Sequence, residues 1–240
     1  MKKIIFSIFV LALTLSACED EASKGVSSIT TYADMTLKGP EVLNWEFGTP
    51  YVDPGIVAME GTTDISNKVT ISEINVNQIG RYIITYKVLN SDGFAATTTR
   101  TVYVYKSSDT RNGYYDSKVT RSYNGAAYTS RGPYAHGIKV LGNGTDELWV
   151  EDLIGGWYYI GSNYGIDYAT AGVVKLNTSS EPNSVTGLKN VEALPWGYVV
   201  VPTTAEPSSY TAATKTLQVN VEVTGLMKFR VTLNNPTPLN

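Results

Sequence analysis

Cysteine and histidine are almost absent from this sequence of 240 residues, which holds one of each, Cys18 and His136. A lone cysteine excludes disulfides within the chain and thiolate metal clusters. A lone histidine excludes a histidine-rich metal site, and no Gly-x-Ser-x-Gly string provides a nucleophile beside it. We therefore expect His136 to be a surface or hydrogen-bonded residue, and we expect no metal site and no cofactor.

Carboxylates are the remaining route to catalysis, because glycoside hydrolysis needs only two acids at a suitable separation. Glu147 and Glu151 would share one face of a short apolar strand. Adjacent acids at strand ends are usually solvated turn residues, so we expect a protein that is not an enzyme. No Asp-x-Asp-x-Asp-Gly loop indicates bound calcium.

Basic clusters and long apolar runs are also scarce. Nineteen Lys and Arg stand against 22 Asp and Glu, which gives a net charge of -3. Phosphate backbones demand clustered Lys and Arg, so this balance argues against nucleic acid as a partner. The apolar run Ile4–Leu15 follows Lys2 and Lys3 and is too short to span a bilayer comfortably. This order predicts an export signal peptide over residues 1–17.

The string Leu-Ser-Ala-Cys that ends at Cys18 resembles the bacterial lipobox, in which the cysteine sulfur receives a diacylglyceryl group. The resemblance implies that Cys18 is lipidated and holds the mature protein to the membrane. The three acids of residues 19–21 resemble the surface-export signal of Bacteroidetes lipoproteins, which implies the outer membrane, facing the cell exterior. The alternative is that these acids only solvate a linker, within a tether over residues 18–38.

The residues that are abundant favour strands. Seventeen tyrosines and four tryptophans stand against five phenylalanines, and threonine and valine are frequent throughout. Such residues suit pleated, half-buried surfaces better than helices. We therefore expect an all-β protein.

Residues 39–106 consist of short predicted strands between turn signals, and the first three of them are Val42–Phe47, Gly55–Glu60 and Asn67–Ile71. The clearest hairpin joins Tyr82–Leu89 to Phe94–Tyr105, and the side chains of both segments alternate with period two. Asp92-Gly93 supplies the turn between them.

This block resembles the immunoglobulin-like repeat domains of Bacteroidetes surface proteins. The resemblance rests on that hairpin, on Asp53-Pro54-Gly55 within a longer motif, and on Gly80-Arg81-Tyr82. It implies an immunoglobulin-like β-sandwich with a spacer or adhesion role and no catalytic residues. It also implies that Tyr82 occupies a tyrosine corner, in which the hydroxyl bonds back to nearby backbone.

A polar linker over residues 107–113 leads to a second block over residues 114–240. The strands predicted there are Tyr114–Ser122, Gly137–Leu141, Glu147–Glu151, Trp157–Ser162, Gly172–Leu176, Tyr198–Val201, Lys215–Val223 and Leu226–Leu233. Strands this numerous need a sandwich or a closed barrel to bury their edges. We therefore expect the second domain to be an antiparallel β-sandwich or barrel.

Aromatic residues gather in this second block and are the best candidates for a binding site. In a strand, Trp157 and Tyr159 would face one way and Tyr158 the other, so at least one ring should reach the surface. Flat rings suit the apolar face of a pyranose, and Asn163 and Asp167 could bind its polar rim. The alternative is that the rings only fill the core. The ligand-binding candidates are Trp149, Trp157, Tyr158, Tyr159, Asn163, Tyr164, Asp167, Tyr168 and Trp196.

The order of lipobox, immunoglobulin-like block and aromatic-rich β block resembles small lipoproteins encoded with the outer-membrane glycan-uptake systems of Bacteroidetes. In the second block the resemblance rests on residues 153–159, Tyr164-Gly165 and residues 172–176. It implies a non-catalytic surface lipoprotein that binds an extracellular polysaccharide or oligosaccharide. The alternative is a structural or protein-interaction role, docked on an outer-membrane transporter or another surface protein.

Overall fold

The computed structural model of the protein describes residues 29–239, so the predicted signal peptide and Cys18 lie outside the described residues. The described part is almost entirely strand and turn, with two 3-10 helices of three residues each, η2 (Ser66–Lys68) and η3 (Ile166–Tyr168). The predicted all-β class is therefore confirmed. Within residues 29–239 no helix is long and apolar enough to cross a membrane.

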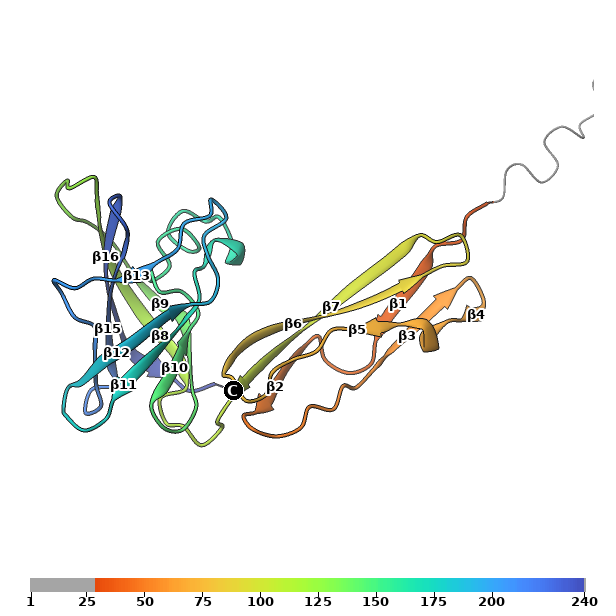
Figure 1. Ribbon diagram of the computed structural model, residues 1–240, viewed down its shortest axis with the longest axis horizontal. Helices are drawn as coiled ribbons and strands as arrows, with labels where there is room; N and C mark the ends of the chain where they lie inside the picture. The colour runs from red at the N-terminus through yellow and green to blue at the C-terminus, as the bar shows by residue number, and fades with distance from the viewer. Residues whose placement is uncertain (1–28, 240) are drawn as a thin grey trace, which may run out of the picture. The chain divides into compact units, whose positions relative to one another are not determined.

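The chain divides into two compact units. Figure 1 gives the strand labels that are used below. The smaller unit contains Ile56–Thr70 and Tyr86–Thr98 together with the described residues up to Thr36. The larger unit contains Leu37–Gly55, Ile71–Thr85 and the chain from Thr99 onward.

The N-terminal part forms two sheets. The first sheet has the order β1 (Ala33–Leu37), β3 (Ile56–Glu60), β4 (Thr63–Asp64). The second has the order β2 (Val42–Glu46), β7 (Ala95–Tyr105), β6 (Gly80–Leu89), β5 (Thr70–Ile71). In the smaller unit the buried side chains of Ala58 in β3, Ile65 and Val88 in β6 pack together, so both sheets contribute to one core.

The turn motifs behave as the sequence predicts. The hydroxyl of Tyr82 donates to the carbonyl of Gln78 at 2.9 Å, which is the geometry of a tyrosine corner. Gly55 has a φ of 88° and its N–H donates to Asp53 Oδ1 at 2.6 Å. Gly93 has a φ of 86°, so the hairpin turn uses the left-handed conformation that glycine permits.

The C-terminal part is a closed antiparallel barrel. Its strands are β8 (Gly113–Tyr123), β9 (Thr129–Gly142), β10 (Glu147–Val150), β11 (Gly172–Asn177), β12 (Asn183–Asn190), β14 (Ser209–Thr211), β15 (Thr216–Val223) and β16 (Met227–Thr237). Each strand pairs with the next, and β16 pairs back to β8 as well as to β15, which closes the ring. The short strand β13 (Val201–Pro202) adds to β15 outside this ring. Of the two predicted alternatives, the barrel is the correct one.

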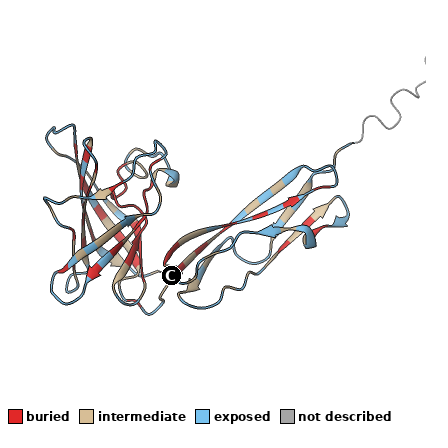
Figure 2. Ribbon diagram, in the orientation of Figure 1, coloured by how far each residue is buried: buried red, intermediate tan, exposed pale blue. Residues whose placement is uncertain are grey.

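Buried side chains from the wall strands form the core of the barrel, and Figure 2 colours the buried residues of these strands red. In β15 the predicted period-two face is buried completely or nearly so, and its members are Leu217, Val219, Val221 and Val223. Phe229 and Val231 lie beside them in the neighbouring strand β16 and are fully buried. A sheet closed on itself therefore supplies the core that a domain without disulfides needs.

Several sequence predictions differ from the observed elements. Trp157–Ser162 is a run of turns and not a strand, and only Val201 of the predicted strand Tyr198–Val201 lies in one. In the predicted strand Asn67–Ile71, only Thr70 and Ile71 are extended. The tether predicted to reach residue 38 already contains β1, which pairs with β3. Strands β12 and β14 were not predicted, because their burial alternates weakly and their residues are mostly polar.

Candidate ligand-binding site

Four connections meet at one end of the barrel. Because neighbouring strands are antiparallel, the β8–β9, β10–β11, β12–β14 and β15–β16 connections all lie at the same end. We call this end the mouth of the barrel; its loops lie above the wall strands in Figure 1. The mouth therefore gathers residues that lie far apart in the sequence.

The longest of these connections, the β10–β11 loop, is held at both its ends by one buried carboxylate. Asp152 is fully buried, and its Oδ1 accepts hydrogen bonds from the N–H groups of Ile154 at 3.1 Å and Thr170 at 3.2 Å. Its Oδ2 accepts a third from Gly156 N–H at 2.8 Å. Asp152 thus joins the start of the loop to its end.

Burial raises the pKa of the Asp152 carboxyl to about 7, while the three backbone N–H groups act in the opposite direction. Burial also raises the pKa of its neighbour Glu151, whose carboxylate accepts the N–H of Lys139 at 3.2 Å. Both acids are therefore engaged by backbone donors inside the fold, which argues against the predicted candidate Glu151 as an exposed catalytic acid.

Two glycines explain why the chain turns here and does not continue as a strand. Gly155 and Gly156 have φ values of 63° and 82°, which side-chain-bearing residues rarely adopt. A Cβ on Gly155 would lie 2.6 Å from Cγ1 of Val231, and one on Gly156 would lie 2.9 Å from Cδ1 of Ile160. The compact turn that follows brings Trp157 into the barrel and leaves Tyr158 at the mouth.

Four rings come together at the mouth, and we call them the aromatic cluster. Its members are Tyr158, Tyr164, Tyr168 and Trp196. Trp196 contacts the three tyrosines at centroid distances of 5.0, 6.5 and 5.3 Å, with interplanar angles of 77°, 79° and 63°. Tyr158 and Tyr164 are nearly parallel, at 9°. The cluster thus presents rings in two roughly perpendicular orientations.

The aromatic cluster is accessible to a ligand. Tyr164 and Trp196 remain 53% and 48% exposed, and Tyr158 and Tyr168 are half-buried beside them. Exposed apolar rings that are contiguous, and not scattered, are typical of binding surfaces.

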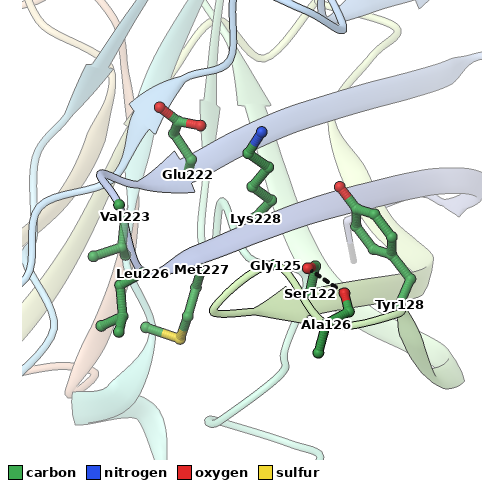
Figure 3. Close-up of a pocket in the computed structure, with 10 residues that line it drawn as sticks. Ser122, Gly125, Ala126, Tyr128, Glu222, Val223, Leu226, Met227 and Lys228 are labelled. Atoms are coloured by element: carbon green, nitrogen blue, oxygen red, sulfur yellow. Dashed lines mark hydrogen bonds between the residues drawn. The ribbon is translucent and has the colours of Figure 1, made fainter.

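A hollow of about 350 Å³ adjoins the aromatic cluster at the mouth. Its lining residues are Ser122, Gly125, Ala126, Tyr128, Glu222, Val223, Gly225, Leu226, Met227 and Lys228. Figure 3 shows Glu222 and Lys228 side by side on neighbouring strands, with Met227 and Leu226 below them. The hydroxyl of Tyr158 donates to Met227 Sδ at 3.2 Å, so Met227 links the hollow to the cluster.

Two arginines, which the sequence interpretation did not single out, accompany the rings. The guanidinium carbons of Arg121 and Arg131 lie 4.5 and 4.4 Å from the ring centroid of buried Trp157. Arg121 Nη1 donates to the hydroxyl of Tyr158 at 3.1 Å. Arg121 lies in β8 and Arg131 in β9, and the sequence contains no sign that these two strands are adjacent.

The structure separates the nine predicted candidates into three groups. Tyr158, Tyr164, Tyr168 and Trp196 come together in the aromatic cluster. Trp149 and Trp157 are unavailable to a ligand, because they are only 1% and 2% exposed. Trp157 packs against Phe229 inside the barrel, and Trp149 belongs to a separate buried cluster with Leu141 and Ala171.

The remaining three candidates, Tyr159, Asn163 and Asp167, lie in the β10–β11 loop but outside the aromatic cluster. Tyr159 is half-buried, and burial raises its pKa. Asn163 and Asp167 are exposed and remain predictions for the polar rim of a site. His136 is exposed, with its Nδ1 2.8 Å from the hydroxyl of Thr237, in agreement with its predicted surface role. No group of three or more potential metal ligands occurs in the described part of the chain.

Comparisons with known proteins agree with this architecture. The model of a domain described as "Bacterial surface protein, Ig-like domain" matches residues 35–104. A second model, for the C-terminal domain of a protein family, matches residues 104–235, which is more than half of the chain. No curated protein matches the chain.

A solved structure resembles most of the molecule. The crystal structure of the lipoprotein BT2262 from Bacteroides thetaiotaomicron is 27% identical to this chain, with a TM-score of 0.52. The match covers 85% of this chain and 100% of the other.

Proposed function

Because the chain belongs to the protein family whose C-terminal domain was matched over residues 104–235, and carries a bacterial surface Ig-like domain before it, we propose that it is a non-catalytic glycan-binding lipoprotein. It is held in the outer membrane by lipid on Cys18 and faces the cell exterior, as an accessory of a polysaccharide-uptake system. The solved relative, itself a lipoprotein, supports the lipid anchor.

The observation that carries the binding proposal is the half-exposed aromatic cluster. The axial C–H groups of a pyranose form an apolar face that packs on a flat ring, and the perpendicular rings of Tyr164 and Trp196 offer two such faces. Asn163 and Asp167 lie in the same loop and supply polar groups for the sugar hydroxyls. No buried carboxylate is required for this role, and Asp152 instead fixes the loop that carries Tyr158, Tyr164 and Tyr168.

The test is affinity electrophoresis of the full chain, purified in a non-ionic detergent, through gels that contain different polysaccharides. We expect at least one polysaccharide to retard the protein. Trp196→Ala and Tyr164→Ala should each weaken binding about tenfold or more, as is usual when a central aromatic contact is removed. Phe94→Ala is the matched control, because Phe94 is 50% exposed but lies in the smaller unit.

Two outcomes would contradict the proposal. One is no retardation by any polysaccharide, with a folded protein shown by circular dichroism. The other is retardation that the cluster variants leave unchanged. Co-purification of an outer-membrane transporter protein that is lost in the cluster variants, without sugar binding, would favour the alternative of a docking role.

A further inference from the structure

The two arginines at the mouth lie on the inner face of the barrel wall. Arg131 in β9 is the register partner of Val119 in β8, and Val119 is fully buried inside the barrel. Arg121 follows two residues after Val119 in the same strand, so its side chain is on the same face. Two cationic groups are therefore directed into the mouth end of a mostly apolar interior, where they contact the ring of Trp157.

The positive charge of this pair is not neutralised by the protein. Among residues 29–239, neither arginine has a carboxylate within 4.0 Å, although Arg81, Arg111 and Arg230 each have one. The partners that the two do have are neutral: Tyr158 for Arg121, and the Trp157 carbonyl with the Ser162 hydroxyl for Arg131.

The guanidinium of Arg121 also lacks part of its hydrogen bonding. Its Nε is buried and has no hydrogen-bond partner in the described structure. Both residues are partly exposed as a whole, so their charge is neither fully hydrated nor paired. Two partly desolvated like charges near one ring repel each other, and an anion at this position would relieve that repulsion.

We infer that the ligand of the aromatic cluster is an anionic glycan, whose carboxylate or sulfate groups bind at the guanidinium groups of Arg121 and Arg131. The inference rests on the proposed glycan-binding function and specifies its ligand class. A guanidinium group suits either anion, because its N–H groups form a planar fork that matches two oxygen atoms.

Tyr158 connects the two parts of this site. Its ring belongs to the aromatic cluster, and its hydroxyl accepts a hydrogen bond from Arg121. One sugar unit can therefore lie against the rings of Tyr158 and Trp196 while its acidic substituent reaches the arginines. A neutral glycan could pack on the rings, but it would not neutralise the positive charge of Arg121 and Arg131.

The test compares polymers that share a backbone and differ in charge. We would measure the full chain in detergent against polygalacturonate and its highly methyl-esterified form, and against dextran sulfate and dextran. We expect at least one charged polymer to bind about tenfold or more tightly than its neutral counterpart, with a difference that shrinks as salt rises. Which charged polymer binds distinguishes a carboxylate from a sulfate.

Variants assign the effect to the arginines. Arg121→Gln and Arg131→Gln should each reduce the preference for the charged polymer about tenfold or more, since each removes a charge-assisted hydrogen bond. Lys118→Gln is the matched control: it removes one positive charge from the same strand, β8, at an exposed position. Should either arginine variant fail to fold, Arg121→Lys and Arg131→Lys keep the charge and lose the planar fork. These should retain a weaker preference for the charged polymer.

The outcomes separate the two proposals. Equal affinity for the charged and neutral forms of a polymer would overturn the anionic ligand and leave glycan binding intact. So would an undiminished charge preference in both glutamine variants. Binding to none of a wide polysaccharide panel would overturn the proposed function itself.

Discussion

At Gly155 the backbone passes so close to strand β16 that an added Cβ would meet Val231 at 2.6 Å. Gly165, in the same loop, has a φ of 91°, but nothing lies within 4 Å of the position of its Cβ. Both glycines thus have the positive φ that disfavours side-chain-bearing residues. Only Gly155 also lacks the space for a Cβ.

This contrast predicts the relative cost of two alanine substitutions. We expect Gly155→Ala to lower the free energy of unfolding by about 2–4 kcal/mol, the sum of left-handed strain and overpacking against β16. Gly165→Ala should cost only the strain, about 1–2 kcal/mol. Urea unfolding of both variants measures the difference, and equal losses would mean that β16 moves to accept the methyl group.

The ring positions show how far single residues could be predicted. Trp157 is buried and Tyr158 is half-buried, but Tyr159 is half-buried as well. The predicted alternation, with Trp157 and Tyr159 on one face, therefore does not hold, because this segment is a run of turns and not a strand. The burial of Trp149 could not be predicted. Alternation along a strand does not show that a second apolar cluster, with Leu141 and Ala171, covers Trp149 outside the barrel core.

Among the elements, the tyrosine corner is the one predicted from a short motif and then observed in atomic detail. The hydrogen bond from Tyr82 to Gln78 fixes the chain that enters β6. Tyr82→Phe removes only this bond, and we expect it to lower the free energy of unfolding by about 0.5–1.5 kcal/mol. The control is Tyr32→Phe, because Tyr32 is 67% exposed. Equal stability of Tyr82→Phe and the unaltered protein would show that the bond does not contribute.

Strands with period-two apolar patterns were predictable, and turn-rich segments were not. Strands β6, β7, β8, β15 and β16 were located within a few residues, because their side chains alternate with period two; in β15 and β16 one face is also consistently apolar. Trp157–Ser162, in the β10–β11 loop, was wrongly predicted to be a strand, because aromatic residues have high strand propensity. The Gly-Gly pair before it was the signal for a turn.

The arginines of the mouth were missed for a different reason. Arg121 and Arg131 acquire their meaning only from the pairing of β8 with β9 and from the position of Trp157 between them. Register is a property of two strands, and a single sequence does not state it. Trp196 also reaches the cluster through strand pairing, because β11 and β12 bring the residues that precede β11 next to those that follow β12.

For the whole molecule, buried acids and paired acids oppose each other in their dependence on pH. Asp152 has a pKa of about 7 in the fold against 3.8 in the unfolded chain, so the folded protein binds more protons between these values. Its contribution to stability is therefore lost as the pH rises from about 4 to 7. Glu46 has the opposite sign: hydrogen bonds from Lys106 and Ser107 lower its pKa to about 2, and its contribution is lost as the pH falls below 4.5.

We therefore expect maximum stability near pH 4 and a lower free energy of unfolding at pH 8, by no more than about 4 kcal/mol. Urea unfolding at both pH values measures this difference. Asp152→Asn removes the buried titration and should flatten the dependence above pH 5, whereas Asp167→Asn, at an exposed position, should not change it. A protein that gains stability steadily from pH 5 to pH 8 would contradict this account of Asp152.

The closed ring of strands has a practical consequence for experiments on this protein. The β11–β12 connection, with exposed Ser179, lies at the end of the barrel remote from the mouth, and residues 29–239 contain no cysteine. Ser179→Cys would therefore create a single reactive thiol in the described chain. A fluorophore or a sensor-chip tether attached there leaves the mouth directed toward the solution.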